Sequence, residues 1–171
     1  MLGMLADIAG IVGGLAVVAA VIFAVIQVRQ FQRQRRDSAA IELMRILQAP
    51  QFVQAFLTLG QVPNGISARK LRSMGQDYEA AAMSMVNTYE TVGLLVFRNA
   101  VSFQTVREVS GGILVALWGK LHVWVSDVRQ EHNSERFAEW FQWLVERIGE
   151  QEAKAPTKPA YKRFTAWQPR G

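Results

Sequence analysis

An uninterrupted apolar segment near the N-terminus constrains this chain more than any other feature of its sequence. Residues 8–28 read IAGIVGGLAVVAAVIFAVIQV and contain no charged side chain and a single amide. At about 1.5 Å per residue, a helix of this length spans roughly 30 Å, the thickness of the hydrocarbon core of a bilayer. The sequence therefore predicts an N-terminal stub and a transmembrane helix over residues 1–28.

A cleaved secretory signal peptide is the alternative interpretation of this segment. The basic cluster follows the apolar run, however, and no small-residue cleavage site precedes Arg29, so we favour an uncleaved anchor. The cluster consists of Arg29, Arg33, Arg35 and Arg36. Because the side richer in Lys and Arg stays in the cytoplasm, we expect an external N-terminus and a cytoplasmic C-terminal domain, in a bacterial inner membrane. The same arginines are predicted to contact anionic lipid headgroups.

Small residues recur at four-residue spacing along the apolar segment. They are Ala6, Gly10, Gly14, Ala20 and Ala24. Such residues allow two helix backbones to approach closely in lipid, where no hydrophobic effect drives their association. The segment is thus a candidate for packing against another membrane helix, although Gly and Ala are also common in spans that stand alone. It contains no ionisable side chain, so we expect it to anchor or pack and not to conduct ions.

The composition excludes several classes of chemistry. Half of the 171 residues are hydrophobic and 19% are charged, which excludes a disordered chain. The absence of cysteine excludes disulfides, thiolate metal sites and cysteine nucleophiles. The sequence also contains no phosphate-binding loop, no dinucleotide fingerprint and no Glu-x-x-His pair of the kind that holds two iron ions. We therefore predict a protein that is not an enzyme and that holds no metal or cofactor.

Beyond the apolar segment, the sequence predicts an all-α protein. Residues 29–49 lack Gly and Pro and favour a juxtamembrane continuation of the first helix, which Pro50 breaks. Residues 50–152 are expected to form a cytoplasmic bundle of about five helices: one ending at Gly60, then 67–74, 76–99, 103–131 and 135–152, with Ser102 and Ser134 as caps of the last two. The apolar residues 113–119 are too few to cross a membrane, so we expect them in the core.

Glu90 is the acidic residue that we single out inside this bundle. It follows Tyr89 in an otherwise apolar stretch, and a buried carboxylate needs a paired cation. Arg107 or Arg129 on the next helix is predicted to supply that cation, which would make a buried ion pair. A solvent-exposed Glu90 is the alternative.

A basic aromatic tail over residues 153–171 ends the chain. It contains five basic residues and no acid, and three prolines prevent a regular helix. Its candidate contact residues are Lys158, Tyr161, Lys162, Arg163, Phe164 and Trp167. Alternating rings and cations are typical of segments that lie on a membrane or on an acidic protein surface, whereas a solvated tail is the alternative. Nucleic acid is not an expected partner, because the first basic cluster borders a membrane span.

The segment from Asn87 onward resembles domain-of-unknown-function family 4760, a bacterial family. The resemblance rests on Tyr89, Glu90, Val92, Gly93 and Leu95, then on Gly111, Gly112, Trp118, Arg129 and a closing helix over 137–144. It covers about 60 residues directly, and the N-terminal span and the AIELMRILQAPQFVQAF segment fit the same layout, whereas the tail lies outside it. The resemblance implies a membrane-anchored helical protein and no particular reaction.

These features predict a non-enzymatic, single-span membrane protein that acts through interactions. We expect an accessory or scaffolding subunit of a larger membrane complex, with respiratory and photosynthetic complexes as candidate hosts. Its partners would be other membrane protein subunits and anionic lipid, bound through the span, the helical domain and the tail. The alternative is a free-standing, membrane-tethered sensor or regulator whose cytoplasmic domain binds a soluble ligand or protein.

Overall fold

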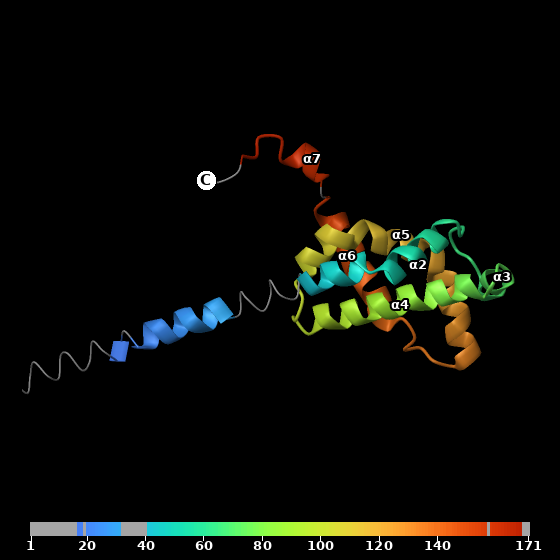
Figure 1. The fold of residues 1–171 in the computed structure, drawn as a ribbon, viewed down its shortest axis with the longest axis horizontal. Helices are drawn as coiled ribbons and strands as arrows, with labels where there is room; N and C mark the ends of the chain where they lie inside the picture. Colours follow the sequence, from blue (N-terminus) through green and yellow to red (C-terminus); the bar gives the residue numbers. More distant parts are fainter. Residues whose placement is uncertain (1–16, 19, 32–40, 157, 169–171) are drawn as a thin grey trace, which may run out of the picture.

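The computed structural model describes residues 17–18, 20–31, 41–156 and 158–168 (Figure 1). These residues form helices and no strand, which confirms the all-α class for the described part of the chain. Helical residues 17–18, 20–31 and 41–48 are followed by α2 (Pro50–Gly60), α3 (Ala68–Ser73), α4 (Gln76–Phe97), α5 (Phe103–His132), α6 (Glu139–Lys154) and α7 (Ala160–Arg163). Figure 1 shows helices α2 to α6 gathered into one body, with Ala20–Phe31 projecting from one end.

The N-terminal apolar segment is described only in part. The helix Ala20–Phe31 is apolar, and every one of its residues is exposed. The rest of the predicted span, at 1–16 and 19, lies outside the described residues, as do residues 32–40 of the predicted juxtamembrane helix. The structure therefore describes the second half of the predicted anchor without a neighbour packed around it.

Among the described helices, α5 alone is long and apolar enough to cross a membrane. Core helices of soluble domains can be equally long and apolar. In this molecule Leu114, Leu117 and Leu121 of α5 are almost completely buried inside the body. The expectation that the apolar residues 113–119 belong to the core is therefore correct for Leu114 and Leu117, whereas Val115 is 47% exposed on the outer side of α5.

The break between the first helical segment and α2 lies where the sequence predicts it. Ala49 is extended, with φ −61° and ψ 135°, because a residue before proline avoids the helical conformation. The packed body nevertheless begins earlier than the predicted boundary at Pro50. Leu43, on the helical segment 41–48, is only 3% exposed and belongs to the core. The juxtamembrane segment thus contributes its last turns to the body.

Helix α4 lies at the centre of the body and contacts α2, α3, α5 and α6. Its residues Met85, Tyr89 and Val92 are fully buried, as expected from their helical spacing. The Tyr89 ring stacks on Phe141 of α6 at 5.4 Å between ring centroids and meets the edge of Phe52 of α2 at 6.0 Å. Burial of the Tyr89 phenol raises its pKa. One aromatic cluster therefore ties three helices together.

The start of α6 differs from the prediction. The helix begins at Glu139, four residues later than expected, after a turn that ends with Ala138 in the left-handed region at φ 59°. Ser134 is not its cap, and α6 receives no hydrogen bond from its own N-cap side chain within the described structure. Ser102 does precede α5 as predicted, but its hydroxyl makes no cap hydrogen bond among the described residues. The predicted end of α6 at Glu152 is also early, because the helix continues to Lys154.

Candidate interaction surface

An exposed cluster of three aromatic rings lies where the end of α4 meets α6. Phe97 is 55% exposed, and its ring centroid lies 4.7 Å from that of Trp140 and 5.9 Å from that of Trp143. The two indole rings are half-buried and lie 6.0 Å apart. We call Phe97, Trp140 and Trp143 the aromatic patch. Large aromatic side chains that remain in contact with water in a folded body commonly mark a binding surface.

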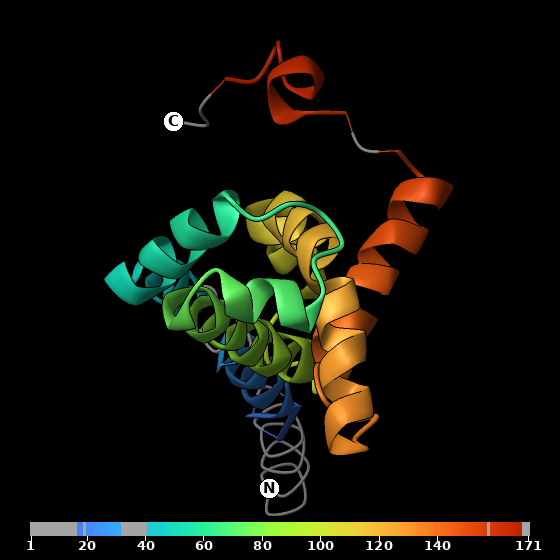
Figure 2. The same cartoon turned by 90° about the vertical axis from the view of Figure 1, so that its right-hand side faces the viewer.

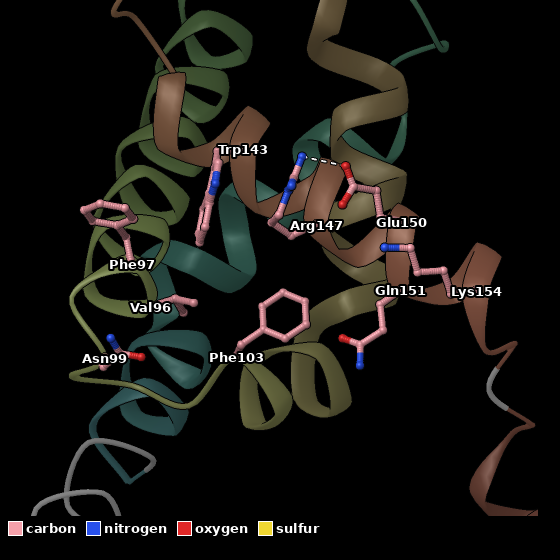
Figure 3. A pocket seen from close by; sticks show the side chains of 9 residues that line it. All are labelled: Val96, Phe97, Asn99, Phe103, Trp143, Arg147, Glu150, Gln151 and Lys154. Atoms are coloured by element: carbon pink, nitrogen blue, oxygen red, sulfur yellow. Dashed lines mark ion pairs between the residues drawn. The ribbon is translucent and has the colours of Figure 1, made fainter.

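A cleft of about 530 Å³ opens beside the aromatic patch, between α4, the start of α5 and α6 (Figure 3). We call it the α4–α6 cleft. Its lining consists of Val96, Phe97, Asn99, Phe103, Trp143, Arg147, Glu150, Gln151 and Lys154. Figure 3 shows Phe97 and Trp143 on one side, Phe103 in the middle, and Gln151 and Lys154 on the other side. The cleft therefore has an aromatic wall and a polar, mainly cationic wall.

Arg147 is the cation at the centre of the polar wall. One of its terminal nitrogens pairs with Glu150 at 2.6 Å, and its side chain is 41% exposed. Its Nε atom is buried and has no hydrogen-bond partner among the described residues. Lys154 adds a second, exposed cation in the last turn of α6. The side chain of Arg147 thus lines the cleft and has a buried donor without a partner among the described residues.

Backbone geometry at the end of α4 positions the aromatic wall. Asn99 adopts the left-handed conformation at φ 56°, which Asn tolerates better than most residues. The amide of Asn99 donates to Val96 and that of Ala100 to Leu95, each at 2.9 Å, so the last carbonyls of α4 are satisfied. The chain then reverses into α5. This stop leaves Phe97 at the rim of the cleft.

A glycine sets how closely α6 approaches α4. A Cβ atom at Gly93 would overlap the carbonyl oxygen of Trp140 and would lie 2.8 Å from its carbonyl carbon. Only a residue without a side chain allows this approach. The contact places Trp140 and, one turn later, Trp143 against Phe97.

Glu90 has a different role from the predicted buried ion pair. It is half-buried, and one carboxylate oxygen accepts hydrogen bonds from the backbone amides of Trp140 and Phe141, each at 3.0 Å. It forms no ion pair within the described part of the chain, so the prediction of a cation partner is wrong. The physical reason is that the unpaired amides at the start of a helix attract a carboxylate as a cation does. Glu90 caps α6 from a neighbouring helix.

The two arginines predicted to pair with Glu90 have other partners. Arg129 donates to the carbonyl oxygen of Phe137 and to the side-chain oxygen of Gln142, each at 2.8 Å. Arg107 lies 3.7 Å from a carboxylate oxygen of Glu152. Both arginines therefore connect α5 to α6 or to the turn before it, and neither reaches α4.

The predicted contact residues of the tail are exposed. Tyr161, Phe164 and Trp167 are 73%, 51% and 70% exposed, respectively. Lys162 lies 5.6 Å from the centre of the Tyr161 ring, and the guanidinium of Arg163 lies 4.6 Å from that of Phe164. Figures 1 and 2 draw the single helical turn of α7 apart from the body. The rest of the described tail is irregular, as predicted.

A groove of about 910 Å³ separates the tail from the body. Gly111, Gly112 and Val115 of α5 line one side of it, and Lys158, Arg163 and Phe164 of the tail line the other. Lys158 is exposed, like the remaining tail residues. The tail therefore faces α5 across open space.

The predicted sites in the anchor are described only in part. Ala20 and Ala24 lie on the helix Ala20–Phe31, where both are exposed, and Arg29 is exposed near the end of the same helix. The other predicted helix-packing residues, Ala6, Gly10 and Gly14, lie outside the described residues, and so do Arg33, Arg35 and Arg36. Packing against a second membrane helix and contact with lipid headgroups remain predictions.

The α4–α6 cleft was not predicted from the sequence. Trp140, Trp143, Arg147 and Lys154 recur along one side of α6 at intervals of three, four and seven residues, which was the available signal. The opposite wall comes from α4 and α5, and no local pattern connects it with α6. No group of three or more His, Asp or Glu side chains suited to a metal ion occurs among the described residues.

Comparison with known proteins identifies a family and no individual relative. None of the curated proteins and none of the solved structures compared with the chain matches it. The model of the domain of unknown function DUF4760 matches residues 14–148. The match begins inside the apolar segment and ends within α6, so the tail lies outside it, as the resemblance in the sequence suggested. Because it covers most of the 171 residues, the chain belongs to the DUF4760 family.

Proposed function

We propose that this protein is a membrane-anchored, non-enzymatic interaction subunit that binds other membrane proteins through its basic aromatic tail. The proposal combines the apolar N-terminal segment with a packed helical body and an exposed tail. In a bacterium the anchor would lie in the inner membrane, with the body and the tail in the cytoplasm, because the arginines follow the apolar segment.

The exposure of the tail aromatics is the observation that carries the proposal. Within seven residues the tail holds Tyr161, Phe164 and Trp167, each more than half exposed. An aromatic ring left in water forgoes the stabilisation of about 1.5–3 kcal/mol that burial of a large apolar side chain provides. A partner surface that covers the three rings would recover it. The neighbouring cations favour an acidic partner surface.

The packed helical body supports the proposal because it holds the start of the tail in a defined position. Its core runs from Leu43 to Ile148, and its last long helix ends at Lys154, two residues into the tail. The tail therefore leaves the body from a fixed point. A scaffold needs this arrangement, because a partner held by the tail is then kept at a defined distance from the membrane.

Site-specific cross-linking in the membrane tests this function. A photoreactive amino acid in place of Trp167 is expected to capture one abundant membrane protein in amounts comparable to the chain itself. Mass spectrometry after extraction in mild detergent identifies the captured partner. A soluble protein captured in its place would favour a membrane-tethered sensor or regulator.

A matched pair of variants controls for non-specific binding through exposed apolar side chains. Phe164→Ser with Trp167→Ser removes two exposed aromatic side chains from the tail. Leu57→Ser removes an apolar side chain of α2 that is 64% exposed. The tail variant is expected to lose co-purification of the partner, and the α2 variant is expected to keep it. Equal co-purification by both variants would contradict the proposed role of the tail.

A further inference from the structure

We propose that the α4–α6 cleft binds the headgroup and upper acyl chain of an anionic phospholipid in the membrane that anchors the protein. The inference rests on the membrane anchoring in the proposed function, and it assigns a ligand to a site to which the part of the tail after Lys154 does not contribute. Three independent features support it: the position of the cleft, the nature of its aromatic wall and the unused donor of its arginine.

The cleft lies at the end of the body where the chain arrives from the anchor. Figure 1 shows the helical segment that begins at residue 41 entering the body at the same end as the connection between α4 and α5. Nine residues separate Phe31 from residue 41, and the ten Cα-to-Cα steps between them span at most roughly 35 Å when extended, and about 15 Å as a helix. An anchor that ends near Phe31 therefore keeps this end of the body close to the headgroups.

The aromatic wall matches the chemistry of a membrane interface. Trp and Phe side chains of this kind collect at the level of the headgroups, where one part of the ring meets hydrocarbon and the other meets water. Trp143 is half-buried and Phe97 is 55% exposed, so both rings present apolar surface outward. Phe103 and Val96 extend this apolar surface into the cleft. An acyl chain would cover the same atoms.

The polar wall matches a phosphate group. Arg147 has already used one terminal nitrogen on Glu150, but its buried Nε has no partner among the described residues. A guanidinium binds phosphate oxygens through two adjacent donors, and Lys154 adds a second positive charge nearby. Arg147 and Lys154 together outweigh the single charge of Glu150. The cleft thus favours an anionic headgroup over a zwitterionic one.

A bound lipid would fix how the body sits on the membrane. The anchor alone attaches the body through a single segment, which leaves rotation about that segment free. A second contact at the cleft restricts this rotation and holds α6 against the bilayer. Because the tail follows directly from α6, the orientation of the tail would be set as well.

Tryptophan quenching by brominated lipid tests the proposal on the full chain. The chain is reconstituted into phosphatidylcholine vesicles that contain phosphatidylglycerol, with bromine on the acyl chains of one lipid or of the other. Trp167→Phe is present throughout, so that tail contacts do not contribute. With one net positive charge in the cleft, we expect about fivefold enrichment of the anionic lipid, and therefore stronger quenching by brominated phosphatidylglycerol at equal mole fraction.

Variants locate the effect in the cleft. Trp143→Phe together with Trp140→Phe, whose indole lies 6.0 Å away, is expected to remove the selectively quenched fluorescence. Arg147→Gln with Lys154→Gln is expected to equalise quenching by the two lipids. Arg147→Lys, which keeps the charge, is expected to retain part of the preference. The matched control, Lys70→Gln with Arg136→Gln, removes two exposed cations outside the cleft and is expected to change nothing. Circular dichroism checks that each variant is folded.

Flotation of the vesicles separates the failure of this proposal from that of the anchoring. A chain that floats with the vesicles but is quenched equally by both lipids, or whose preference survives the Arg147 and Lys154 changes, overturns the lipid site alone. A chain that does not float overturns the anchoring and the lipid site together.

Discussion

Two residues one helical turn apart on α4 fix the position of α6. The carboxylate of Glu90 accepts hydrogen bonds from the first free backbone amides of α6, and Gly93 leaves space for the carbonyl group of Trp140. One contact is electrostatic and the other is steric, and both act on the same turn of α6. The start of α6 is therefore set by a neighbouring helix, and with it the aromatic patch.

Replacement of Glu90 by Gln is expected to lower the stability of the body by about 1 kcal/mol, because a neutral amide caps the helix less well than a carboxylate. For a body of this size, the thermal midpoint would fall by about 4 °C. Thermal unfolding followed by circular dichroism measures the difference. Glu135→Gln, at an exposed position before α6, serves as the control and is expected to leave the midpoint unchanged. An unchanged midpoint in the Glu90 variant would exclude the capping role.

Replacement of Gly93 by Ala is expected to destabilise the body by about 1–3 kcal/mol, since the added methyl group forces α4 and α6 apart. Gly149→Ala is the matched control, because a Cβ atom at this position on α6 meets no described atom within 4 Å. The control is expected to stabilise the body by up to about 1 kcal/mol, since Ala favours the helix over Gly. Denaturation in urea measures both changes. Two variants that shift stability in the same direction would contradict the close approach at Gly93.

At the scale of whole elements, local sequence signals predicted most helices and failed where a distant residue decides the boundary. Pro50 and Gly60 define α2, and Asp77 in the first turn and Asn99 after the last define α4. These signals act within a few residues of the helix end. The cap of α6 comes from Glu90, about 50 positions earlier, so the sequence placed the start of α6 at Glu135 and gave Glu90 the wrong partner.

The candidate sites show the same dependence on whether the signal is local in the sequence. The exposed tail could be read from its own prolines, cations and rings. The α4–α6 cleft could not, because Phe97, Phe103 and Arg147 come from three helices and meet only after α4 and α6 have packed together. A pattern on α6 alone does not indicate which surface faces it.

Arg72 connects three helices in a way that depends on pH. Its guanidinium on α3 binds both carboxylate oxygens of Glu131 on α5, at 2.7 and 2.8 Å, and one oxygen of Glu79 on α4 at 2.8 Å. The hydrogen bonds from Arg72 lower the pKa of Glu131 below its ordinary value of 4.5. A carboxylate with a depressed pKa in the folded state stabilises the fold above its ordinary pKa, and this contribution is lost as the pH falls through the depressed value.

The Arg72→Gln variant is therefore expected to unfold at a lower urea concentration than the parent near pH 7, and the two are expected to converge as the pH falls through the depressed pKa of Glu131. The difference is also expected to shrink in high salt, because all three side chains are partly exposed. Arg69→Gln, on the exposed side of the same helix, is the control and is expected to match the parent throughout. A deficit that persists at low pH would mean that Arg72 acts through packing.

At the scale of the whole molecule, the chain contains two apolar helical segments that are used differently. In Ala20–Phe31 every residue is exposed, so its apolar side chains are not buried in a protein core in the described structure. In α5 most of the large apolar residues, such as Leu114 and Trp124, are buried against the rest of the body, although Val115 is exposed. Transfer into lipid stabilises a helix less when its apolar side chains are already buried in a protein core than when they are exposed to water. The membrane anchor is therefore expected in the first segment, and α5 is expected to remain in the body.

A fragment that begins at residue 41 and ends at residue 156 distinguishes the two segments. It retains the core from Leu43 to Ile148 and lacks the apolar N-terminal segment. We expect it to be soluble without detergent and to unfold cooperatively, whereas the full chain is expected to remain in the membrane fraction after a wash in high salt and alkaline carbonate. Among the exposed apolar side chains of the fragment, Val53 and Leu57 lie on the 11-residue helix α2 and Val115 lies on α5, so they do not form a span. A fragment that needed detergent and resisted the same wash would show that α5 leaves the core to cross the bilayer, and it would overturn the placement of the body outside the membrane.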